Sequence, residues 1–257
     1  MIIVNADDLG QDSQVNRAIV QCFRNGLCSS TTLMATMPGF EEACDLVRQA
    51  NLTNHVGLHL VLRDGFPLTE PIRKIPAFCD SNGNLSVLTA RSVLSMSGEE
   101  KRALAEEIRA QISRCRKSGV PLTHVDSHYH LHTNFAVARV LVRVMREQGL
   151  LRVRIARNCG PGIGKTKRIY KSLFNDWLRR KGVAGTKYFG SADDFLYSSN
   201  CSARAMGPEE SFEIMIHPIL NDTGQIVDRD AHSSVIEVMR KMACYDKAVS
   251  FSGHKYE

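Results

Sequence analysis

Short apolar runs alternate along the chain with longer segments in which apolar residues recur every three or four positions. The first run, residues 2–5, predicts a buried strand, and the periodic segment 13–25 predicts a helix that ends at Gly26. The alternation continues toward the C-terminus. It predicts further strands over 29–36, 55–61, 122–127, 151–156, 186–190 and 211–217, and further helices over 40–50, 98–118, 135–148, 166–181, 192–200 and 229–243.

Strands that alternate with helices are typical of parallel βαβ units. About seven such units follow one another in the 257 residues. We therefore expect one α/β domain over residues 1–257, with a distorted (β/α) TIM-barrel-like fold. Residues 63–97 interrupt the alternation with three prolines and the turn signal Asn82-Gly83, so we interpret this segment as an insertion or lid.

Composition narrows the class of protein. Hydrophobic residues make up 43% and charged residues 23% of the chain, as in ordinary soluble proteins. No apolar stretch approaches the ~18 residues of a membrane span, and no signal-peptide pattern opens the chain. The eight cysteines include no Cys-x-x-Cys pair, which indicates free, mostly buried thiols in a reducing compartment. We expect a cytoplasmic protein with no membrane partner.

The net charge of +6 is modest and does not require a nucleic-acid partner. The densest basic runs, 165–168 and 179–181, both fall in the predicted helix 166–181. A solvated helix face explains them, and the runs lack the interleaved aromatics of a nucleic-acid-binding surface. A positive surface would also suit an anionic substrate.

Two adjacent acids, Asp7 and Asp8, follow the first predicted strand directly. Burying such a pair is costly unless a cation or a hydrogen-bond network compensates it, although the acids could instead cap the next helix. His59 lies near the end of the strand 55–61, where a lone histidine is more often a core residue. His217 lies at the end of the strand 211–217, where it could belong to a turn or act as a general acid.

The densest group of reactive side chains is 124–132, which holds four histidines and an aspartate: His124, Asp126, His128, His130 and His132. Neutral imidazole is the commonest metal ligand, and a neighbouring carboxylate fixes which ring nitrogen binds the metal. We expect the strand to end near residue 127 and the remainder to form a loop.

Five of these side chains fall at or just after the C-terminal end of a predicted strand, which is the catalytic face of an α/β barrel. They are Asp7, Asp8, His59, His128 and His217. A mixed set of histidines and carboxylates suits metal-assisted hydrolysis. The metal would polarise a carbonyl, a free carboxylate would take the proton of water, and a histidine would protonate the leaving group.

Four motifs, in this order, resemble the YdjC-like carbohydrate deacetylases, which include the ChbG-type chitooligosaccharide deacetylases. The motifs are Asn5-Ala6-Asp7-Asp8, Gly57-Leu58-His59, the segment 124–130 and Met215-Ile216-His217-Pro218. The resemblance implies a distorted barrel that removes N-acetyl groups from amino-sugar oligosaccharides. One difference is Ile219, where the family often has a glycine.

The resemblance also implies roles for seven residues. The metal ligands would be Asp8, His59 and His128. Asp7 would be the general base and His217 the general acid. His130 and Arg157 would contact the substrate, and Arg157 could instead orient Asp7. It further implies one divalent metal ion, Mg²⁺, and a homodimer. The ligand types themselves favour Zn²⁺ or Mn²⁺, because Mg²⁺ prefers oxygen ligands. The basic residues near 165–181 suggest a phosphorylated oligosaccharide as substrate.

Two other functions fit parts of the pattern. A metal-dependent phosphoesterase would need a second metal and further ligands, for which His124, Asp126, His130 and His132 are available. A non-catalytic sugar- or metal-binding barrel would be expected to lack the base or the acid, and this chain has both.

Overall fold

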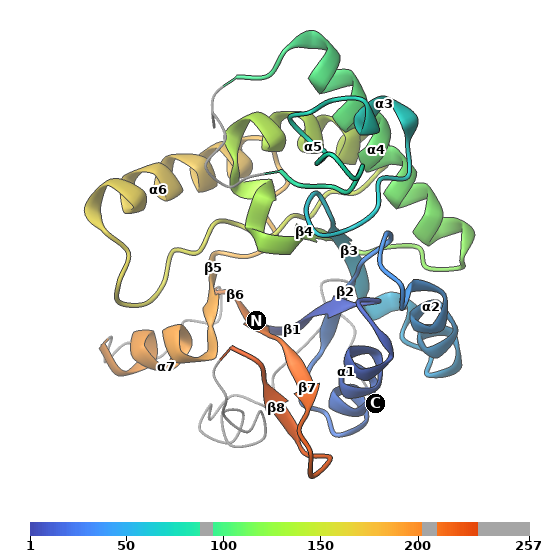
Figure 1. Cartoon of the computed structure of the whole chain (residues 1–257). Coiled ribbons are helices and arrows are strands. Elements are labelled where there is room, and N and C mark those ends of the chain that lie inside the picture. The colour runs from blue at the N-terminus through green and yellow to red at the C-terminus, as the bar shows by residue number, and fades with distance from the viewer. Residues whose placement is uncertain (88–94, 202–209, 231–257) are drawn as a thin grey trace.

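The computed structural model describes residues 1–87, 95–201 and 210–230, and a curled six-stranded parallel sheet forms its framework (Figure 1). The strand order is β4-β3-β2-β1-β6-β5, with the N-terminal strand β1 inside the sheet. Every pairing within this sheet is parallel. The strands are β1 (Ile2–Leu9), β2 (Ser30–Leu33), β3 (Val56–Leu60), β4 (Val125–Ser127), β5 (Tyr188–Ser191) and β6 (Phe212–Ile216).

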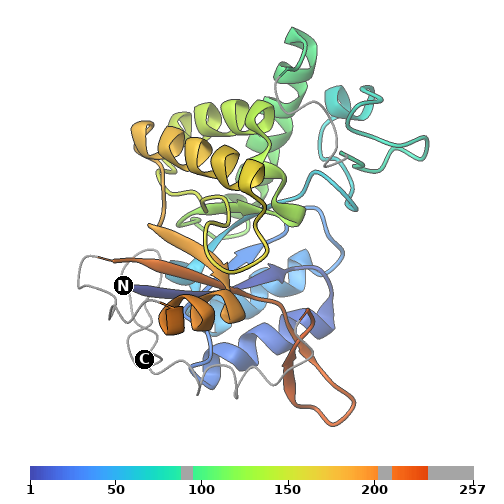
Figure 2. The same ribbon diagram turned by 90° about the vertical axis from the view of Figure 1, so that its left-hand side faces the viewer.

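Helices lie on two sides of this sheet. α4, α5 and α6 are on one side, and α1 and α2 are on the other (Figures 1 and 2). The predicted helices before residue 202 all form, with small shifts at their ends. They are α1 (Ser13–Arg24), α2 (Phe40–Gln49), α4 (Gly98–Lys117), α5 (Phe135–Glu147), α6 (Lys165–Arg180) and α7 (Ala192–Cys201).

Local signals set where several helices begin. Asp12 caps α1 by accepting hydrogen bonds from two backbone N–H groups, and Asn134 caps α5 in the same way. Ser97 and Glu100 form a reciprocal capping box at the start of α4. Such caps satisfy donors that have no partner inside the helix, so each start is encoded by a few neighbouring residues.

The two edges of the sheet are linked through residues 152–158. Val153 forms parallel bridges with Val125 of β4 on one side and with Ala184, just before β5, on the other. The Asn158 N–H donates to the carbonyl of Phe189 in β5 at 3.2 Å. The strand predicted over 151–156 therefore forms only isolated bridges, because its backbone pairs with two different neighbours at single positions.

Two further expectations need correction. β1 does not end at residue 5, because pairing with β2 resumes at Leu9 after an irregularity between Ala6 and Leu9. The acids Asp7 and Asp8 are thus the last part of the strand itself. The antiparallel hairpin β7 (Pro218–Leu220) and β8 (Ile226–Asp228) was not predicted.

The side chain of Asn221 closes the turn of this hairpin by accepting hydrogen bonds from the N–H groups of Thr223 and Gln225. Gly224 supplies a positive φ of 76°. Residues 229–230 form a turn after β8 rather than the start of the helix predicted over 229–243. The rest of that predicted helix, 231–243, lies outside the described residues.

Part of the predicted insertion, 63–97, packs against α4, and residues 88–94 of it lie outside the described residues. The segment contains the short helix α3 (Glu70–Arg73). The buried carboxylate of Glu107 on α4 accepts the backbone N–H groups of Leu68 and Thr69 at 3.0 to 3.1 Å. This contact anchors the segment, while its role as a lid stays a prediction.

Apolar side chains from both faces of the sheet and from the helices form one buried core. The six cysteines whose side chains are described are free and buried, as predicted: Cys22, Cys28, Cys44, Cys79, Cys115 and Cys159. The side chains of Cys201 and Cys244 lie outside the described part. Within the described ranges, no helix is long and apolar enough to cross a membrane.

Candidate active site

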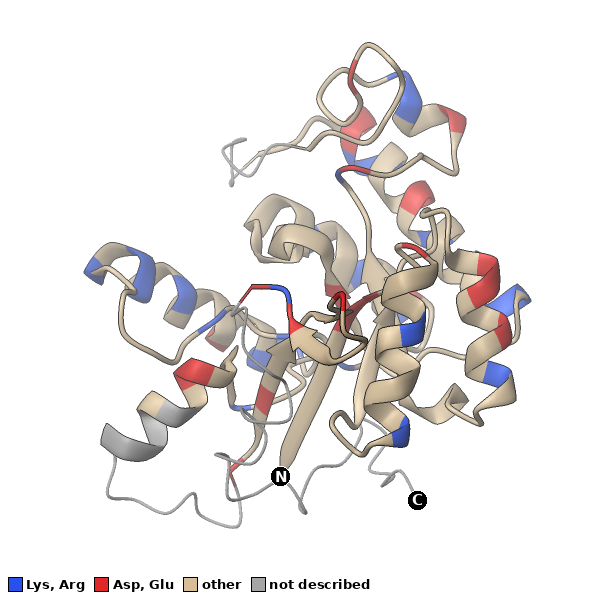
Figure 3. Cartoon of the chain, turned by 60° about the horizontal axis from the view of Figure 1, so that its bottom comes forward, with Lys and Arg blue, Asp and Glu red and all other residues tan. Residues whose placement is uncertain are grey.

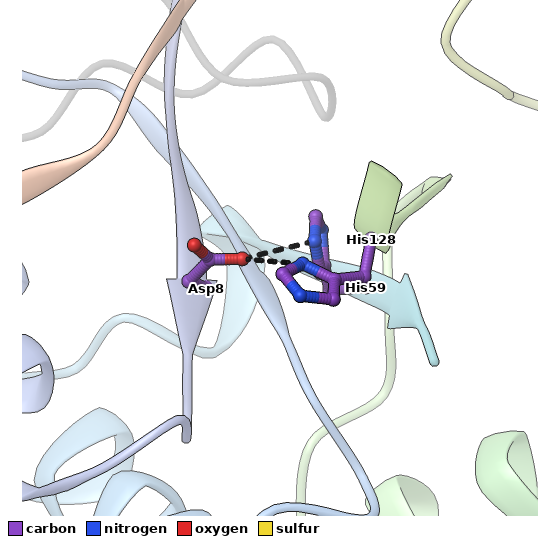
Figure 4. A group of neighbouring side chains, drawn as sticks. All are labelled: Asp8, His59 and His128. Carbon is purple, nitrogen blue, oxygen red and sulfur yellow. Dashed lines mark ion pairs between the residues drawn. The ribbon is translucent and has the colours of Figure 1, made fainter. Parts of the chain in front are cut away.

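Asp8, His59 and His128 converge at the C-terminal ends of three strands (Figure 4). Asp8 lies near the end of β1, His59 near the end of β3, and His128 directly after β4. Oδ1 of Asp8 is 3.1 Å from Nε2 of His59 and 3.2 Å from Nδ1 of His128. One ligand atom from each residue therefore lies within 4.8 Å of the others, a spacing that a single ion can bridge.

The chemistry of these atoms fits a divalent cation. Oδ1 of Asp8 and Nε2 of His59 are buried, and among the described residues no group outside the cluster forms a hydrogen bond with either atom. Buried polar atoms normally have a partner, and an ion would provide one for both. Two imidazoles and a carboxylate also match the three protein ligands of catalytic metal sites, which leave a position for water or substrate.

The charges around the cluster attract a cation. Burial opposes ionisation of Asp8, but the hydrogen bonds from His128 and His59 hold the pKa of its carboxyl well below the usual range. Burial also opposes protonation of His59, yet the nearby Asp126 and Asp8 carboxylates raise the pKa of its ring to about 10. The pocket therefore stabilises positive charge at the position of His59.

Asp126 fixes the orientation of the His59 ring. β3 and β4 pair so that these two residues are direct neighbours, and Oδ1 of Asp126 lies 2.8 Å from Nδ1 of His59. The hydroxyl of Thr32 on β2 donates to the other oxygen of Asp126 at 3.1 Å. A proton on Nδ1 directed to this carboxylate leaves Nε2 available as a ligand.

Three of the six described non-glycine residues with a positive φ lie at or next to this cluster. Asp8 has a φ of 71°, and Tyr129 and His130 each have a φ of 54°. Non-glycine residues adopt this left-handed region at a free-energy cost, and such residues cluster at functional sites. The turn at Tyr129 and His130 ends β4 and lets His128 face Asp8, while Tyr129 stays exposed under the guanidinium of Arg63 at 4.8 Å.

The remaining histidines of the segment 124–132 do not join the cluster. Burial lowers the pKa of His124 and of His132 well below the usual value, so both rings are neutral. Nδ1 of His132 pairs with the hydroxyl of Ser127 at 2.7 Å. Gly57 allows the ring of His124 to pack on β3, because a Cβ there would lie 2.5 Å from that ring.

Arg154, which the sequence analysis did not single out, lies fully buried beside the cluster. Its guanidinium donates to both oxygens of Asp7 at 2.6 and 2.7 Å. It also pairs with Asp126 at 2.8 Å and with Glu213 of β6 at 2.5 Å. Burial opposes its charge, but these three carboxylates raise the pKa of Arg154 well above the usual value.

Arg154 distinguishes two groups of candidate metal ligands, because it occupies one of them. The carboxylates of Asp7 and Asp126 and the ring of His59 also lie close enough to hold an ion. The guanidinium of Arg154 already bridges the two carboxylates, so this second position is filled by a protein cation. In the Asp8 cluster, by contrast, Oδ1 of Asp8 and Nε2 of His59 have no partner outside the cluster among the described residues.

Asp7 lies next to the cluster as an ionised carboxylate. Burial raises its pKa, but the charge and hydrogen bonds of Arg154 outweigh burial and hold the pKa of this carboxyl well below its usual range. Asn5 donates a further hydrogen bond to Oδ1 at 2.8 Å. Oδ2 of Asp7 faces Nε2 of His217 at 3.9 Å. A carboxylate and a histidine thus lie close together beside the Asp8 cluster.

The turn after β8 contributes two further charged residues that the sequence analysis missed. The guanidinium of Arg229 donates to Oδ2 of Asp8 at 2.7 Å, which leaves Oδ1 as the oxygen that faces the histidines. Oδ2 of Asp230 lies 3.0 Å from Nδ1 of His217. The only signal in the sequence is a charged run, 228–230, shortly after the His-Pro motif.

The two predicted substrate contacts have different surroundings. His130 is partly buried, and its ring packs edge-on against Phe189 with centroids 5.7 Å apart. The side chain of Arg157 is 44% exposed and pairs with Asp194. The alternative that Arg157 orients Asp7 is wrong, because Arg154 holds that carboxylate. Substrate binding by His130 and Arg157 stays a prediction.

Basic residues line the exposed part of α6, as Figure 3 shows by the blue positions along that helix. They include Lys165, Lys167, Arg168, Arg179 and Arg180, all of which are exposed. The predicted solvated basic face is therefore present.

Comparison with known proteins identifies the chain's relatives. The sequence model of the family described as YdjC-like protein matches residues 1–247. A carbohydrate deacetylase of Geobacillus stearothermophilus is 35% identical over 220 residues, which cover 86% of this chain and 80% of that protein. A carbohydrate deacetylase of Halalkalibacterium halodurans is 29% identical over 92% of this chain and 90% of that protein.

Other relatives match over a shorter stretch. The carbohydrate deacetylase of Brevibacillus brevis is 36% identical, and the match covers 56% of that protein's length. Among solved structures, a cellobiose-phosphate cleavage protein from Enterococcus faecalis V583 covers 99% of this chain, and this chain covers 97% of it. Its TM-score is 0.69 and its sequence identity 22%, so this likeness concerns the fold.

Proposed function

The chain belongs to the YdjC-like protein family, and we propose that it is a metal-dependent carbohydrate deacetylase. The observation that carries the proposal is the cluster of Asp8, His59 and His128, with Asp7 and His217 beside it. Relatives with the printed name carbohydrate deacetylase support the reaction class.

We propose that Asp8, His59 and His128 hold one divalent ion. When bound, the ion would polarise the acetyl carbonyl and make water more acidic. The family resemblance favours Mg²⁺, whereas two imidazole ligands favour Zn²⁺ or Mn²⁺. Ion competition therefore forms part of the experiment below.

The protein's own groups would move the protons. The carboxylate of Asp7, oriented by Arg154, takes a proton from the attacking water as the new bond from oxygen to the acetyl carbon forms. Nε2 of His217 donates a proton to the nitrogen as the carbon–nitrogen bond breaks. The products are acetate and a free amino sugar. The raised pKa of His217, for which burial is outweighed by Asp230 and Asp7, supplies the protonated ring that this role needs.

We further propose that the substrate is an N-acetylated amino-sugar oligosaccharide of the chitooligosaccharide type. Partly exposed Arg157 and the basic face of α6 would favour a phosphorylated form. Equal kcat/KM values for phosphorylated and plain oligosaccharides would contradict that preference. The homodimer implied by the resemblance is also a proposal, and light scattering on the purified protein would test it.

We propose that the domain has a TIM-barrel-like fold. The support for this proposal is the backbone contacts that link the two edge strands of the sheet, β4 and β5. The bridges of Val153 and the contact between Asn158 and β5 would close the curled sheet into a barrel. In such a barrel, catalytic residues lie at the C-terminal ends of the strands, as Asp8, His59 and His128 do here.

A phosphoesterase is less consistent with the site. Two-metal hydrolysis requires ions about 3.5 to 4 Å apart. The second group of candidate ligands, which includes Asp7 and Asp126, is bridged by Arg154. The neutral rings of His124 and His132 lie in the core. A non-catalytic sugar-binding protein would not need the paired Asp7 and His217.

The test uses metal-stripped protein and N-acetylated chitooligosaccharides. Mg²⁺, Zn²⁺, Mn²⁺ and Co²⁺ are added back in turn, and acetate release is measured. We expect metal-dependent release that falls by roughly 100-fold or more in Asp7→Asn, because general base catalysis contributes about 10² to 10⁴. Asp176→Asn, a change at a partly exposed residue of α6 that pairs with Arg179, serves as the matched control. No acetate from folded protein with any of the ions would refute the proposal.

A further inference from the structure

We propose that Asp230 positions the general acid, His217. In this proposal, the turn after β8 holds the ring of His217 in the orientation that proton transfer requires. The inference rests on the proposed function, in which His217 protonates the leaving amine. It adds a residue from a part of the chain that no motif of the sequence marks.

The turn holds His217 at three points. Oδ2 of Asp230 lies 3.0 Å from the ring nitrogen Nδ1. The backbone N–H of His217 donates to Oδ2 of Asp228 at 3.0 Å, and its carbonyl accepts the N–H of Arg229 at 2.9 Å. Backbone and ring are therefore fixed by consecutive residues, which restricts the ring to one orientation.

That orientation is the one that a general acid needs. A proton on Nδ1 directed to the Asp230 carboxylate leaves Nε2 as the nitrogen that exchanges its proton with substrate. Nε2 points toward Asp7, whose Oδ2 is 3.9 Å away. Among the described residues, the acids that face the ring are Asp230 after β8 and Asp7 and Asp8 of β1, and the ring of His130 interacts with it as well. All three acids are negative, and of these only Asp230 contacts Nδ1.

The same turn also contacts Asp8, one of the proposed metal ligands. Arg229 donates to Oδ2 of Asp8 at 2.7 Å and lies 3.4 Å from the side-chain oxygen of Gln11. Adjacent residues thus contact the proposed acid and a proposed metal ligand. This link fixes the distance between the two sides of the site, which proton transfer to a bound substrate requires.

The first experiment compares Asp230→Ala with wild-type protein loaded with the ion that supports the highest activity. We expect kcat on chitooligosaccharide to fall roughly 10-fold or more with little change in KM, because the side chain acts on the acid and not on the substrate. The basic limb of the kcat profile against pH should move to lower pH, since His217 loses an acceptor for its protonated form. Asp230→Glu should restore part of both effects.

Asp222→Ala is the matched control, because this residue lies in the turn of the same hairpin and has no contact with the site among the described residues. A kcat, KM and pH profile of Asp230→Ala identical to those of Asp222→Ala would overturn the inference. An equal loss in both variants would overturn it as well, since it would indicate a general disturbance of the hairpin.

A second measurement separates this inference from the proposed function. Nitrogen NMR of the imidazole rings in Zn²⁺-loaded protein reports which nitrogen of His217 is protonated, with the signal assigned by its loss in His217→Gln. At a pH above the pKa of the ring, we expect the neutral form protonated at Nδ1 in the wild type and a shift toward the form protonated at Nε2 in Asp230→Ala. An unchanged signal would refute the inference. Absence of acetate release by wild-type protein would refute only the function.

Discussion

Glu213 is a buried acid in the middle of β6, and replacing it with glutamine should change how the stability of the protein depends on pH. Its side chain is 0% exposed; Oε1 accepts the Nε–H of Arg154 at 2.5 Å, and Oε2 has no hydrogen-bond partner among the described residues. Burial raises its pKa most, Arg154 opposes this, and the charge of Asp126 adds to it. The result is a pKa raised from 4.5 to about 7.

The sign of the effect follows from proton binding. Between pH 4.5 and 7 the folded protein holds a proton on Glu213 that the unfolded chain has lost, so the free energy of unfolding decreases as the pH rises. A tenfold change in proton affinity corresponds to about 1.4 kcal/mol. The loss between pH 5 and pH 8 is therefore roughly 2 to 3 kcal/mol for this one group.

Glu213→Gln removes the titration but keeps the shape and a side-chain oxygen for Arg154. Urea unfolding of both proteins, with a chelator present, would be followed by circular dichroism at several values between pH 5 and pH 8. We expect the stability of the variant relative to wild type to increase by roughly 2 to 3 kcal/mol across this interval. Glu106→Gln, an exposed change on α4, is the control. A stability difference that stays constant with pH would refute the reasoning.

Three other variants test the site. Asp126→Asn should weaken metal binding by roughly 10- to 100-fold in calorimetry, because the ring of His59 loses its orienting carboxylate; unchanged affinity would count against the assigned ligands. Arg154→Met should lower the free energy of unfolding by about 3 to 5 kcal/mol in urea, because three buried carboxylates lose their cation; a loss below about 1 kcal/mol would contradict this. Arg157→Gln should raise KM for a phosphorylated oligosaccharide roughly tenfold with kcat unchanged, as expected for one charged hydrogen bond. The control Arg143→Gln, at an exposed position of α5, should leave KM unchanged, and equal KM values for both variants would remove Arg157 from the substrate site.

Local features of the sequence determined much of the fold. The helix from Ser13 begins where Asp12 caps it and ends beside Gly26, whose φ is positive, and each of these signals involves only near neighbours in the chain. The same holds for the alternation of strands and helices, since apolar periodicity is written in consecutive residues. The sequence also indicated which short segments carry the reactive groups, because these lie at or just after the C-terminal ends of buried strands, at 7–8, 59 and 128.

Long-range pairing decided which of those groups act together. Residue type alone did not distinguish the four histidines between 124 and 132, and the resemblance to a family selected His128 as the metal ligand. In the structure, the left-handed turn after His128 and the packing of His124 on Gly57 separate these side chains. Asp7 and its partner Arg154 are 147 residues apart, and no local pattern connects them.

The hairpin of β7 and β8 likewise brings Asp230 to His217 by antiparallel pairing that the sequence analysis did not predict. Strand register sets which side chains become neighbours, and register depends on contacts between segments distant in the chain. The sequence by itself therefore determined the helices before residue 202, most of the parallel strands and the kinds of reactive side chain. The tertiary structure decided which carboxylate pairs with which imidazole, because such pairing depends on distances of a few ångströms between separate strands.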